Sequence, residues 1–243
     1  MAHTSHYTTR FEADQYYHIY NRGIDRLPIF AAPNNARFFL SKFERSIVPV
    51  AELISFAFCL DHFHLLIKIR DLLTLDKYGA LNPRVQFSNT HHLVSHQFRS
   101  LFIGYAKAYN KQGDYTRPGG VFQSPFKRVL VSGSQNVKRV VTYHHINPQK
   151  HGLIKDFRES RQTSYRGYLS HLPTKLDRQL VTDLFGSKEA FIQHHQNAYS
   201  RMLHDEPWHL EDPDDGLKGG LHEPQVLYKM PEELDVPFND LVW

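Results

Sequence analysis

Residues 59–69, with the sequence CLDHFHLLIKI, constrain the fold most, because their apolar side chains alternate as in a buried β-strand. On a strand, residues two apart project from the same face. One face then carries only apolar side chains: Phe63, Leu65, Ile67 and Ile69. His62 and His64 stand side by side on the other face. Neutral imidazole is a common ligand of divalent metals, so this pair predicts a metal site on a rigid strand.

The chain of 243 residues is long enough for one domain with an extension. It contains no run of 18 or more apolar residues, which argues against a membrane span and a membrane partner. The polar N-terminus lacks the apolar stretch of a signal peptide. Cys59 is the only cysteine, which removes intrachain disulfides and any multi-cysteine zinc site. We therefore expect a cytoplasmic protein.

Charge is divided unevenly along the chain. Residues 204–243 hold eleven Asp and Glu against two Lys, whereas the remaining 203 residues carry a net charge of +13. A basic body suits contact with phosphates, although an ordinary solvated surface explains the same count. The acidic segment is rich in Pro and Gly and is expected to lack its own core. We expect a domain at 1–203, with a core at about 16–170 and a helical extension, followed by a flexible tail at 204–243 that could also mimic DNA.

Hydrophobic periodicity predicts the element order β-α-β-β-α-β-α. The expected strands lie in residues 16–23, 52–60, 62–69 and 121–131, and the expected helices in 34–48, 91–112 and 135–147. A loop is expected at 70–90, and short elements at 164–169 and 188–203. The first six elements match an α+β, ferredoxin-like fold, an antiparallel sheet with helices on one face. The other sheet face would then be open to a substrate.

The helix expected at 135–147 separates into two stripes. Ser132 or Ser134 would cap it and Pro148 would end it. One stripe has the spacing that buries a helix against a sheet: Val137, Val140, Val141 and His144. The second has no aliphatic member: Asn136, Arg139, Tyr143 and Asn147. Tyr143 and Asn147 are one turn apart, so their side chains are neighbours. A phenol, an amide and a guanidinium on one face indicate a functional site.

These residues resemble the REP-associated tyrosine transposases, which belong to the single-tyrosine HUH endonucleases of the insertion-sequence IS-two-hundred type. The matching segments occur in the family's order: YYHIYNRG, CLDHFHLL, SHQFRSLFIGYAKAYNK, GGVFQSPFKRVLV, YHHINPQKHGL, SYRGYL and LFGSKEAFIQHH. Together they cover roughly residues 16 to 200. A lone H-x-H is a weak signal, whereas H-x-H followed by Y-x-x-x-N-P-x-x-x-G is a specific one.

The resemblance implies that Tyr143 is a nucleophile and that His62, His64 and Asn147 hold a divalent metal, Mg²⁺ or Mn²⁺. Family members nick single-stranded DNA through a 5′-phosphotyrosine intermediate and a free 3′-OH, which permits strand transfer at hairpin sites in DNA transposition and recombination. A phenol with a pKa near ~10 is a poor nucleophile at neutral pH, which the metal offsets by polarising the phosphate. The resemblance also implies a prokaryotic cell, with action at the nucleoid.

The chain departs from the family pattern before the HUH motif. The family commonly has Met-Pro-Asn there, and this chain has Cys59, Leu60 and Asp61. Asp61 is either an extra metal ligand or a turn residue. We expect a turn residue, because Asp61 is a neighbour on the opposite strand face. The resemblance to the family also implies nothing about the acidic tail.

Basic residues near the motifs are expected to contact DNA phosphates. Ordinary surface charge is an equally good explanation for any one of them. These residues are Arg22, Lys127, Arg128, Lys138, Arg139 and Lys150. Phe126 and Tyr109 either stack on bases or pack in the core, and we favour the core. His145 is expected to face solvent or DNA. The pairs at 91–92 and 194–195 are expected on helix surfaces.

Two other functions remain open at this point. One is a nucleic-acid-binding regulator that keeps the fold without the chemistry. The other is a replication-initiator or relaxase-type nickase, which normally comes with partner domains. Relatives of the IS-two-hundred type dimerise, whereas the REP-associated branch tends to act alone, so we favour a monomer over a homodimer.

Overall fold

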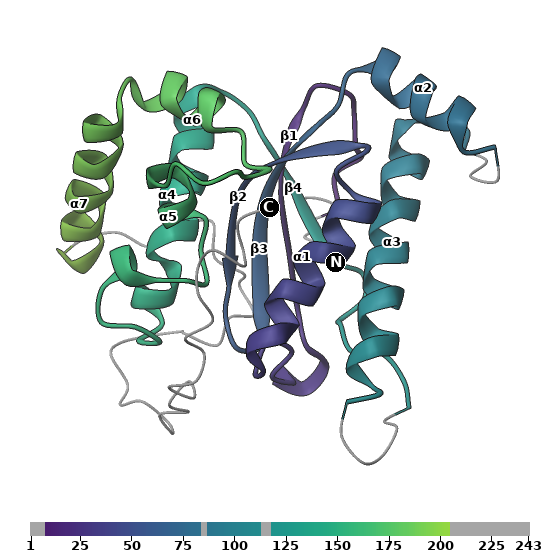
Figure 1. The fold of residues 1–243 in the computed structure, drawn as a ribbon, viewed down its shortest axis with the longest axis horizontal. Helices are drawn as coiled ribbons and strands as arrows, with labels where there is room; N and C mark the ends of the chain where they lie inside the picture. The colour runs from purple at the N-terminus through teal and green to yellow at the C-terminus, as the bar shows by residue number, and fades with distance from the viewer. Residues whose placement is uncertain (1–7, 84–86, 113–117, 205–243) are drawn as a thin grey trace, which may run out of the picture.

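The computed structural model describes residues 8–83, 87–112 and 118–204. Nearly all of the expected acidic tail therefore lies outside the described residues. Four strands, β1 (Tyr16–Arg22), β2 (Ala51–Phe58), β3 (His62–Ile69) and β4 (Lys127–Val131), form an antiparallel sheet in the order β2-β3-β1-β4. Strands β3 and β1 occupy its centre (Figure 1). No helix within the described ranges is long and apolar enough to cross a membrane.

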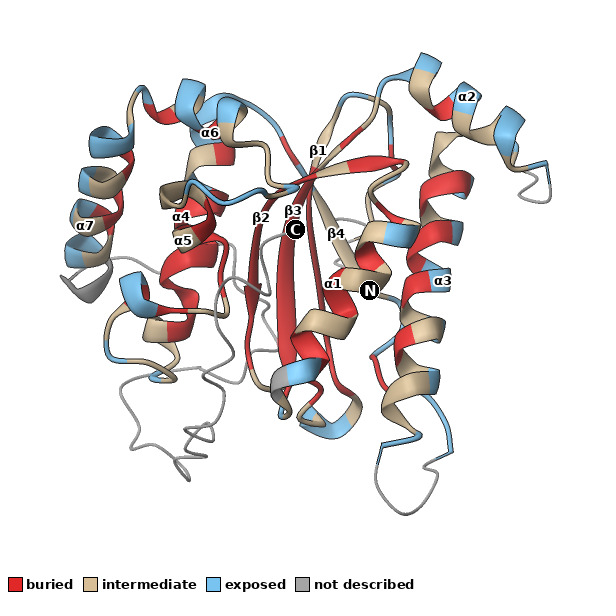
Figure 2. Ribbon diagram, in the orientation of Figure 1, coloured by how far each residue is buried: buried red, intermediate tan, exposed pale blue. Residues whose placement is uncertain are grey.

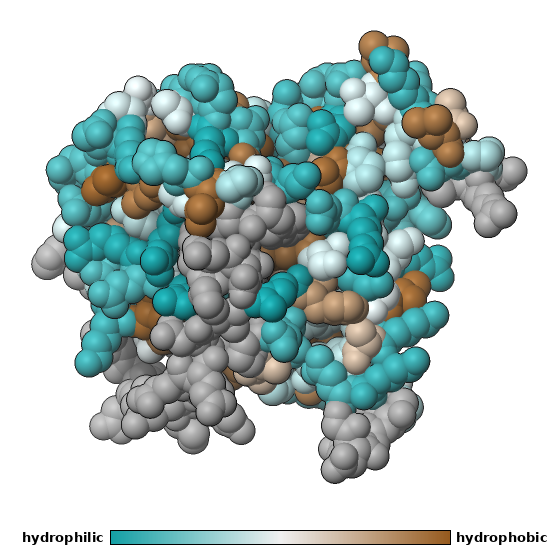
Figure 3. Space-filling view, viewed as in Figure 1, coloured by the Kyte–Doolittle hydropathy of each residue, from teal (hydrophilic) through white to brown (hydrophobic). Residues whose placement is uncertain are grey.

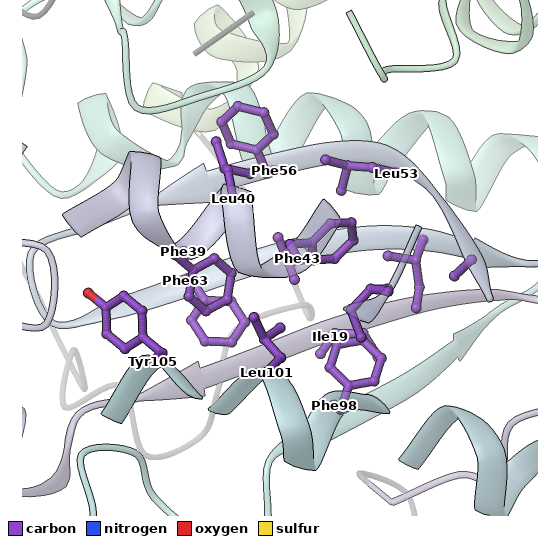
Figure 4. Close-up of a cluster of buried hydrophobic side chains, with 14 of the residues drawn as sticks. Ile19, Phe39, Leu40, Phe43, Leu53, Phe56, Phe63, Phe98, Leu101 and Tyr105 are labelled. Carbon is purple, nitrogen blue, oxygen red and sulfur yellow. The ribbon is translucent and has the colours of Figure 1, made fainter. Parts of the chain in front are cut away.

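Helices α1 (Pro33–Ser46) and α3 (Thr90–Tyr109) cover one face of this sheet (Figure 1). The apolar side chains expected on one face of β3 lie in the core beneath them: Phe63, Leu65, Ile67 and Ile69. Aromatic rings from the two helices fill the same core, among them Phe39, Phe43 and Phe98 (Figure 4). The α+β, ferredoxin-like sheet expected from the sequence is confirmed.

The second sheet face is not open over β2 and β3, contrary to expectation. Helix α4 (Ser134–Lys150) lies against it, because Ile54 and Leu66 on the strands give its valines an apolar surface. Helices α5 (Tyr165–Leu169), α6 (Arg178–Phe185) and α7 (Lys188–His204) complete this layer. Figure 2 shows β2 and β3 buried between the two layers of helices. The residues that α4 presents to the sheet are therefore enclosed.

Several expected boundaries are wrong. Helix α2 (Leu72–Leu81) stands in the expected loop, and the Asp71 side chain caps it by accepting from the Thr74 backbone N–H. Gly133, at φ 83°, precedes α4 without a side-chain cap from either serine. Pro148 lies inside α4, in its last turn, although a proline there removes the hydrogen bond to the His144 carbonyl oxygen and crowds that carbonyl.

Helix α2 carries exposed apolar side chains. This helix exposes three leucines, Leu72, Leu73 and Leu81. Figure 3 shows hydrophobic residues at that end of an otherwise mostly hydrophilic face. The short 3₁₀ helices η1 (Ile24–Arg26) and η2 (Phe157–Glu159) complete the described elements.

His145 and His195 are fully buried, not on a surface as expected. His195 Nδ1 can only donate to the Phe191 carbonyl oxygen, 2.7 Å away, so its Nε2 accepts from His145 Nδ1 at 2.8 Å. His145 Nε2 then accepts from the Ser164 hydroxyl at 2.8 Å, and that oxygen accepts from the Phe56 N–H. Burial lowers the pKa of both imidazoles, which remain neutral. This polar chain links α7, α4 and β2.

We expect Ser164→Ala to lower the free energy of unfolding by about 1–3 kcal/mol, because it leaves a buried imidazole nitrogen and a buried backbone N–H without partners. Urea denaturation followed by circular dichroism measures the change. Ser100→Ala, on the exposed side of α3, is the matched control and should change little. Equal losses in both variants would contradict a stabilising role for the chain.

Candidate functional site

Helix α4 places Tyr143 directly over the paired histidines of β3. The ring centroids of Tyr143 and His64 are 5.4 Å apart, and those of His62 and His64 are 5.3 Å apart. Tyr143 exposes 2% of its surface, His62 8% and His64 5%. The structure thus places the predicted nucleophile beside His64, which is next to His62, in an enclosed position.

Asn147 lies one turn beyond Tyr143 and is completely buried. Its Oδ1 accepts a hydrogen bond from the Cys59 thiol, with Sγ 3.0 Å away. Its Nδ2 has no hydrogen-bond partner among the described residues. Cys59 is also the cross-strand neighbour of His62, since its backbone N–H donates to the His62 carbonyl oxygen at 2.9 Å. Cys59, His62 and Asn147 therefore meet at the end of the β2–β3 hairpin.

Asp61 lies in the hairpin turn, as expected, and its carboxylate holds the ring of His62. Its Oδ1 is 2.6 Å from His62 Nδ1, and its Oδ2 is 3.4 Å from Arg22 Nε. Burial acts most strongly on the pKa of His62 and lowers it, but Cys59 and Asp61 together raise that pKa to about 10. A cation binds only the neutral imidazole, so cation binding at His62 would compete with protons. The His62 Nε2 is buried without a hydrogen-bond partner in the described part of the chain.

Two further histidines lie close to His64, and neither was predicted to be a metal ligand. His18 on β1 has its Nε2 3.0 Å from His64 Nδ1. His144 on α4 has its Nδ1 2.8 Å from Ser55 Oγ. The ring nitrogens of His18, His64 and His144 lie within 4.8 Å of one another, close enough to hold a metal ion. Burial lowers the pKa of His18 to about 3 and those of the other two well below their usual value, so all three are neutral.

A signal for His18 exists in the sequence, but it is conditional. Alternation along β1 places His18 on one face with Tyr16 and Tyr20, and that face meets the HUH histidines only if β1 pairs with β3. Local periodicity does not say which strands pair. His144 was expected on the stripe of α4 that faces the sheet, and the structure places it there, against β2.

Two sets of donors share His64. The three-histidine cluster is wholly buried and has no anionic member, so a divalent charge inside it would lack compensation. Both sets have partnerless buried atoms within the described residues, His144 Nε2 in the cluster and His62 Nε2 in the set of His62, His64 and Asn147, but only the second set has a thiol beside it. This second set fits a cation better. His18 then suits a supporting role: its Nε2 engages His64 Nδ1, so a cation would bind His64 through Nε2.

The basic residues expected to contact DNA occupy different environments. Arg22 is buried and paired with Asp61. Arg128 is half-buried; it donates to the Thr9 carbonyl oxygen at 2.7 Å and lies over the rings of Phe11 and Phe126. DNA contact by either residue stays a prediction.

Of the remaining four basic residues, three are partly buried and one is exposed. Arg139 is exposed on α4. The Lys127 ammonium lies 5.8 Å from the Tyr20 ring and that of Lys138 lies 5.7 Å from the Phe185 ring. The Lys150 ammonium lies 5.8 Å from the ring of Tyr143. Lys150 is therefore the member of the predicted set that the structure places beside the predicted nucleophile.

The two aromatic residues that could have stacked on bases belong to the core instead. Phe126 and Tyr109 are partly buried and pack against the hydrophobic cluster beneath α1 and α3. This agrees with the favoured interpretation of both residues.

We expect His18→Leu to lower the free energy of unfolding by about 1–3 kcal/mol, because it leaves the buried His64 Nδ1 without its partner. Urea denaturation measures this loss. His96→Leu, at an exposed position on α3, is the matched control. A His18 variant as stable as the control would show that the contact between the two imidazoles contributes nothing.

No family model matches the chain, and no curated protein matches it. Among solved structures, a REP-associated tyrosine transposase bound to a REP hairpin matches with a TM-score of 0.50. The match has 12% sequence identity and covers 69% of this chain and 87% of that chain. At this identity the likeness concerns the fold. The arrangement of strands and helices around the histidines is thus the fold of a REP-associated tyrosine transposase.

Proposed function

We propose that the chain is a metal-dependent, site-specific endonuclease and strand transferase for single-stranded DNA, which acts at hairpin sites through a 5′-phosphotyrosine intermediate. The observation that carries this proposal is the placement of Tyr143 over His64, with Asn147 one turn away. The hairpin substrate is supported by the similar solved structure, which is bound to a REP hairpin. The basic body of the chain suits the phosphates of such a partner.

The proposed reaction exchanges one phosphodiester bond for another. The Tyr143 hydroxyl oxygen bonds to phosphorus while the bond from phosphorus to the 3′ oxygen breaks. The phenol proton ends on that 3′ oxygen, which leaves as a free hydroxyl. A 3′-OH from a second strand then attacks the phosphotyrosine and releases the phenol. The bond energy is conserved between the two steps, so rejoining requires no external energy.

Each side chain has a role that its position supports. A divalent cation at His62, His64 and Asn147 would neutralise charge at the scissile phosphate. Lys150, beside the Tyr143 ring, stabilises negative charge that develops on the phenol oxygen as its proton leaves. His18 orients His64 through their shared hydrogen bond. Because Tyr143 is buried, its phenol must become exposed before it reaches the phosphate.

A second candidate is a regulator that binds hairpin DNA without cutting it. The burial of Tyr143 favours this alternative, as does the engagement of Asn147 Oδ1 by Cys59. The presence of every residue that the chemistry needs favours the enzyme. Formation of a covalent protein–DNA species separates the two candidates.

We expect Tyr143→Phe to abolish a covalent adduct with a hairpin-containing single-stranded oligonucleotide while it leaves DNA affinity within about threefold, since the ring is kept and only the nucleophilic oxygen is lost. A denaturing gel detects the adduct, and fluorescence anisotropy measures the affinity. Tyr20→Phe is the matched control, because its ring also lies beside His64, at 5.9 Å. Cleavage by the Tyr143 variant would remove this residue from the nucleophile's role. Binding without any adduct in the wild type would favour the regulator.

We also expect EDTA to stop nicking, and Mn²⁺ or Mg²⁺ to restore it, because the developing charge at the phosphate then loses its stabilisation. His64→Ala should not be restored by either metal at ordinary concentrations. Nicking rates on a labelled oligonucleotide provide the measurement. Full activity in EDTA would contradict a role for a cation.

A further inference from the structure

Cys59 lies among the side chains that we assign to the cation. It is buried, and its thiol donates to Asn147 Oδ1 across 3.0 Å. Two neighbouring ligands on one cation, with bonds of about 2.1 Å to oxygen and 2.3 Å to sulfur, lie roughly 3.1–3.6 Å apart. The sulfur and the amide oxygen are therefore close to the spacing of ligands that share an ion.

The hairpin fixes Cys59 relative to the first histidine of the HUH pair. Cys59 and His62 face each other across the strands, so their side chains project from the same face. His62 and Asn147 each keep one buried polar atom without a partner in the described part of the chain, Nε2 and Nδ2. Such atoms are costly to bury, and a bound ion would engage the His62 nitrogen directly.

We propose that Cys59 is itself a ligand of the cation, and that the site takes a thiophilic divalent ion of the zinc and cobalt class in preference to Mg²⁺. This inference rests on the proposed function for the ligand roles of His62 and Asn147. Thiolate and imidazole suit Zn²⁺ and Co²⁺, whereas Mg²⁺ prefers oxygen donors. A thiolate also supplies the negative charge that the three-histidine cluster lacks.

Binding would release the thiol proton to solvent. The sulfur then exchanges its hydrogen bond to Asn147 for a bond to the cation, and the Asn147 oxygen becomes available as a second ligand. In the competing explanation, Cys59 is only a small buried side chain that donates to an amide. The two explanations differ in the spectrum of the metal-loaded protein.

The test is a titration of the metal-free full chain with Co²⁺, followed by absorption spectroscopy. Because Cys59 is the only cysteine, any thiolate-to-cobalt charge-transfer band reports this residue alone. We expect the band to saturate at one equivalent. Cys59→Ser should remove it and weaken Co²⁺ binding by about tenfold or more in calorimetry, with Mn²⁺ affinity changed by no more than about threefold. In His62→Gln, more Co²⁺ should be needed to produce the charge-transfer band. The band should still form at high Co²⁺.

Two outcomes overturn the inference: Co²⁺ binding without the band, or no Co²⁺ binding at all. The wild-type spectrum decides this even if the Cys59 variant fails to fold. The gel assay for the Tyr143 adduct in Mg²⁺ or Mn²⁺ is independent of this result. An adduct without a cobalt–thiolate band would leave the proposed function standing and remove Cys59 from the site. A band without an adduct would keep the cation site and remove the nuclease.

Discussion

The burial of three valines of α4 against β2 and β3 determines where every other part of the site lies. Val137, Val140 and Val141 pack with Ile54 and Leu66, and this contact sets how the helix rotates above the sheet. A helix that buries this stripe must turn Tyr143 and Asn147 toward the end of the hairpin, where His62 and His64 stand. The hydrophobic effect thus positions the polar residues, because hydrogen bonds among them contribute little net free energy.

Enclosure changes the chemistry of those polar residues. Imidazoles on a solvated strand would exchange protons freely near neutral pH, but here burial keeps His18, His64 and His144 neutral. His62 behaves in the opposite way, because Asp61 and Cys59 favour its charged form. The pKa values of neighbouring imidazoles on one strand are therefore shifted in opposite directions. Arg22 balances the Asp61 carboxylate and belongs to the same arrangement.

Local patterns in the sequence predicted much of the fold and part of the candidate site. They missed the remainder for identifiable physical reasons. Alternation in residues 59–69 and the two stripes of α4 predicted the faces of one strand and one helix, and the resemblance to the transposase family placed Tyr143 near His64. These patterns were insufficient for His18, since strand pairing is a long-range property. The face expected to be open is covered, and Ile54 and Leu66 carried that information, because apolar residues on both faces of a strand indicate burial on both sides. His145 and His195 were assigned to surfaces because a histidine gives no sign of burial until its partner is known.

The enclosed phenol has a kinetic consequence. If the chain cleaves DNA, only molecules that have opened around Tyr143 are competent, so the observed rate equals the intrinsic rate multiplied by the open fraction. A ligand that binds the open form raises that fraction, and random single strands that do not bind it leave the protein inert. Latency of this kind would confine strand breakage to the correct target without any separate inhibitor.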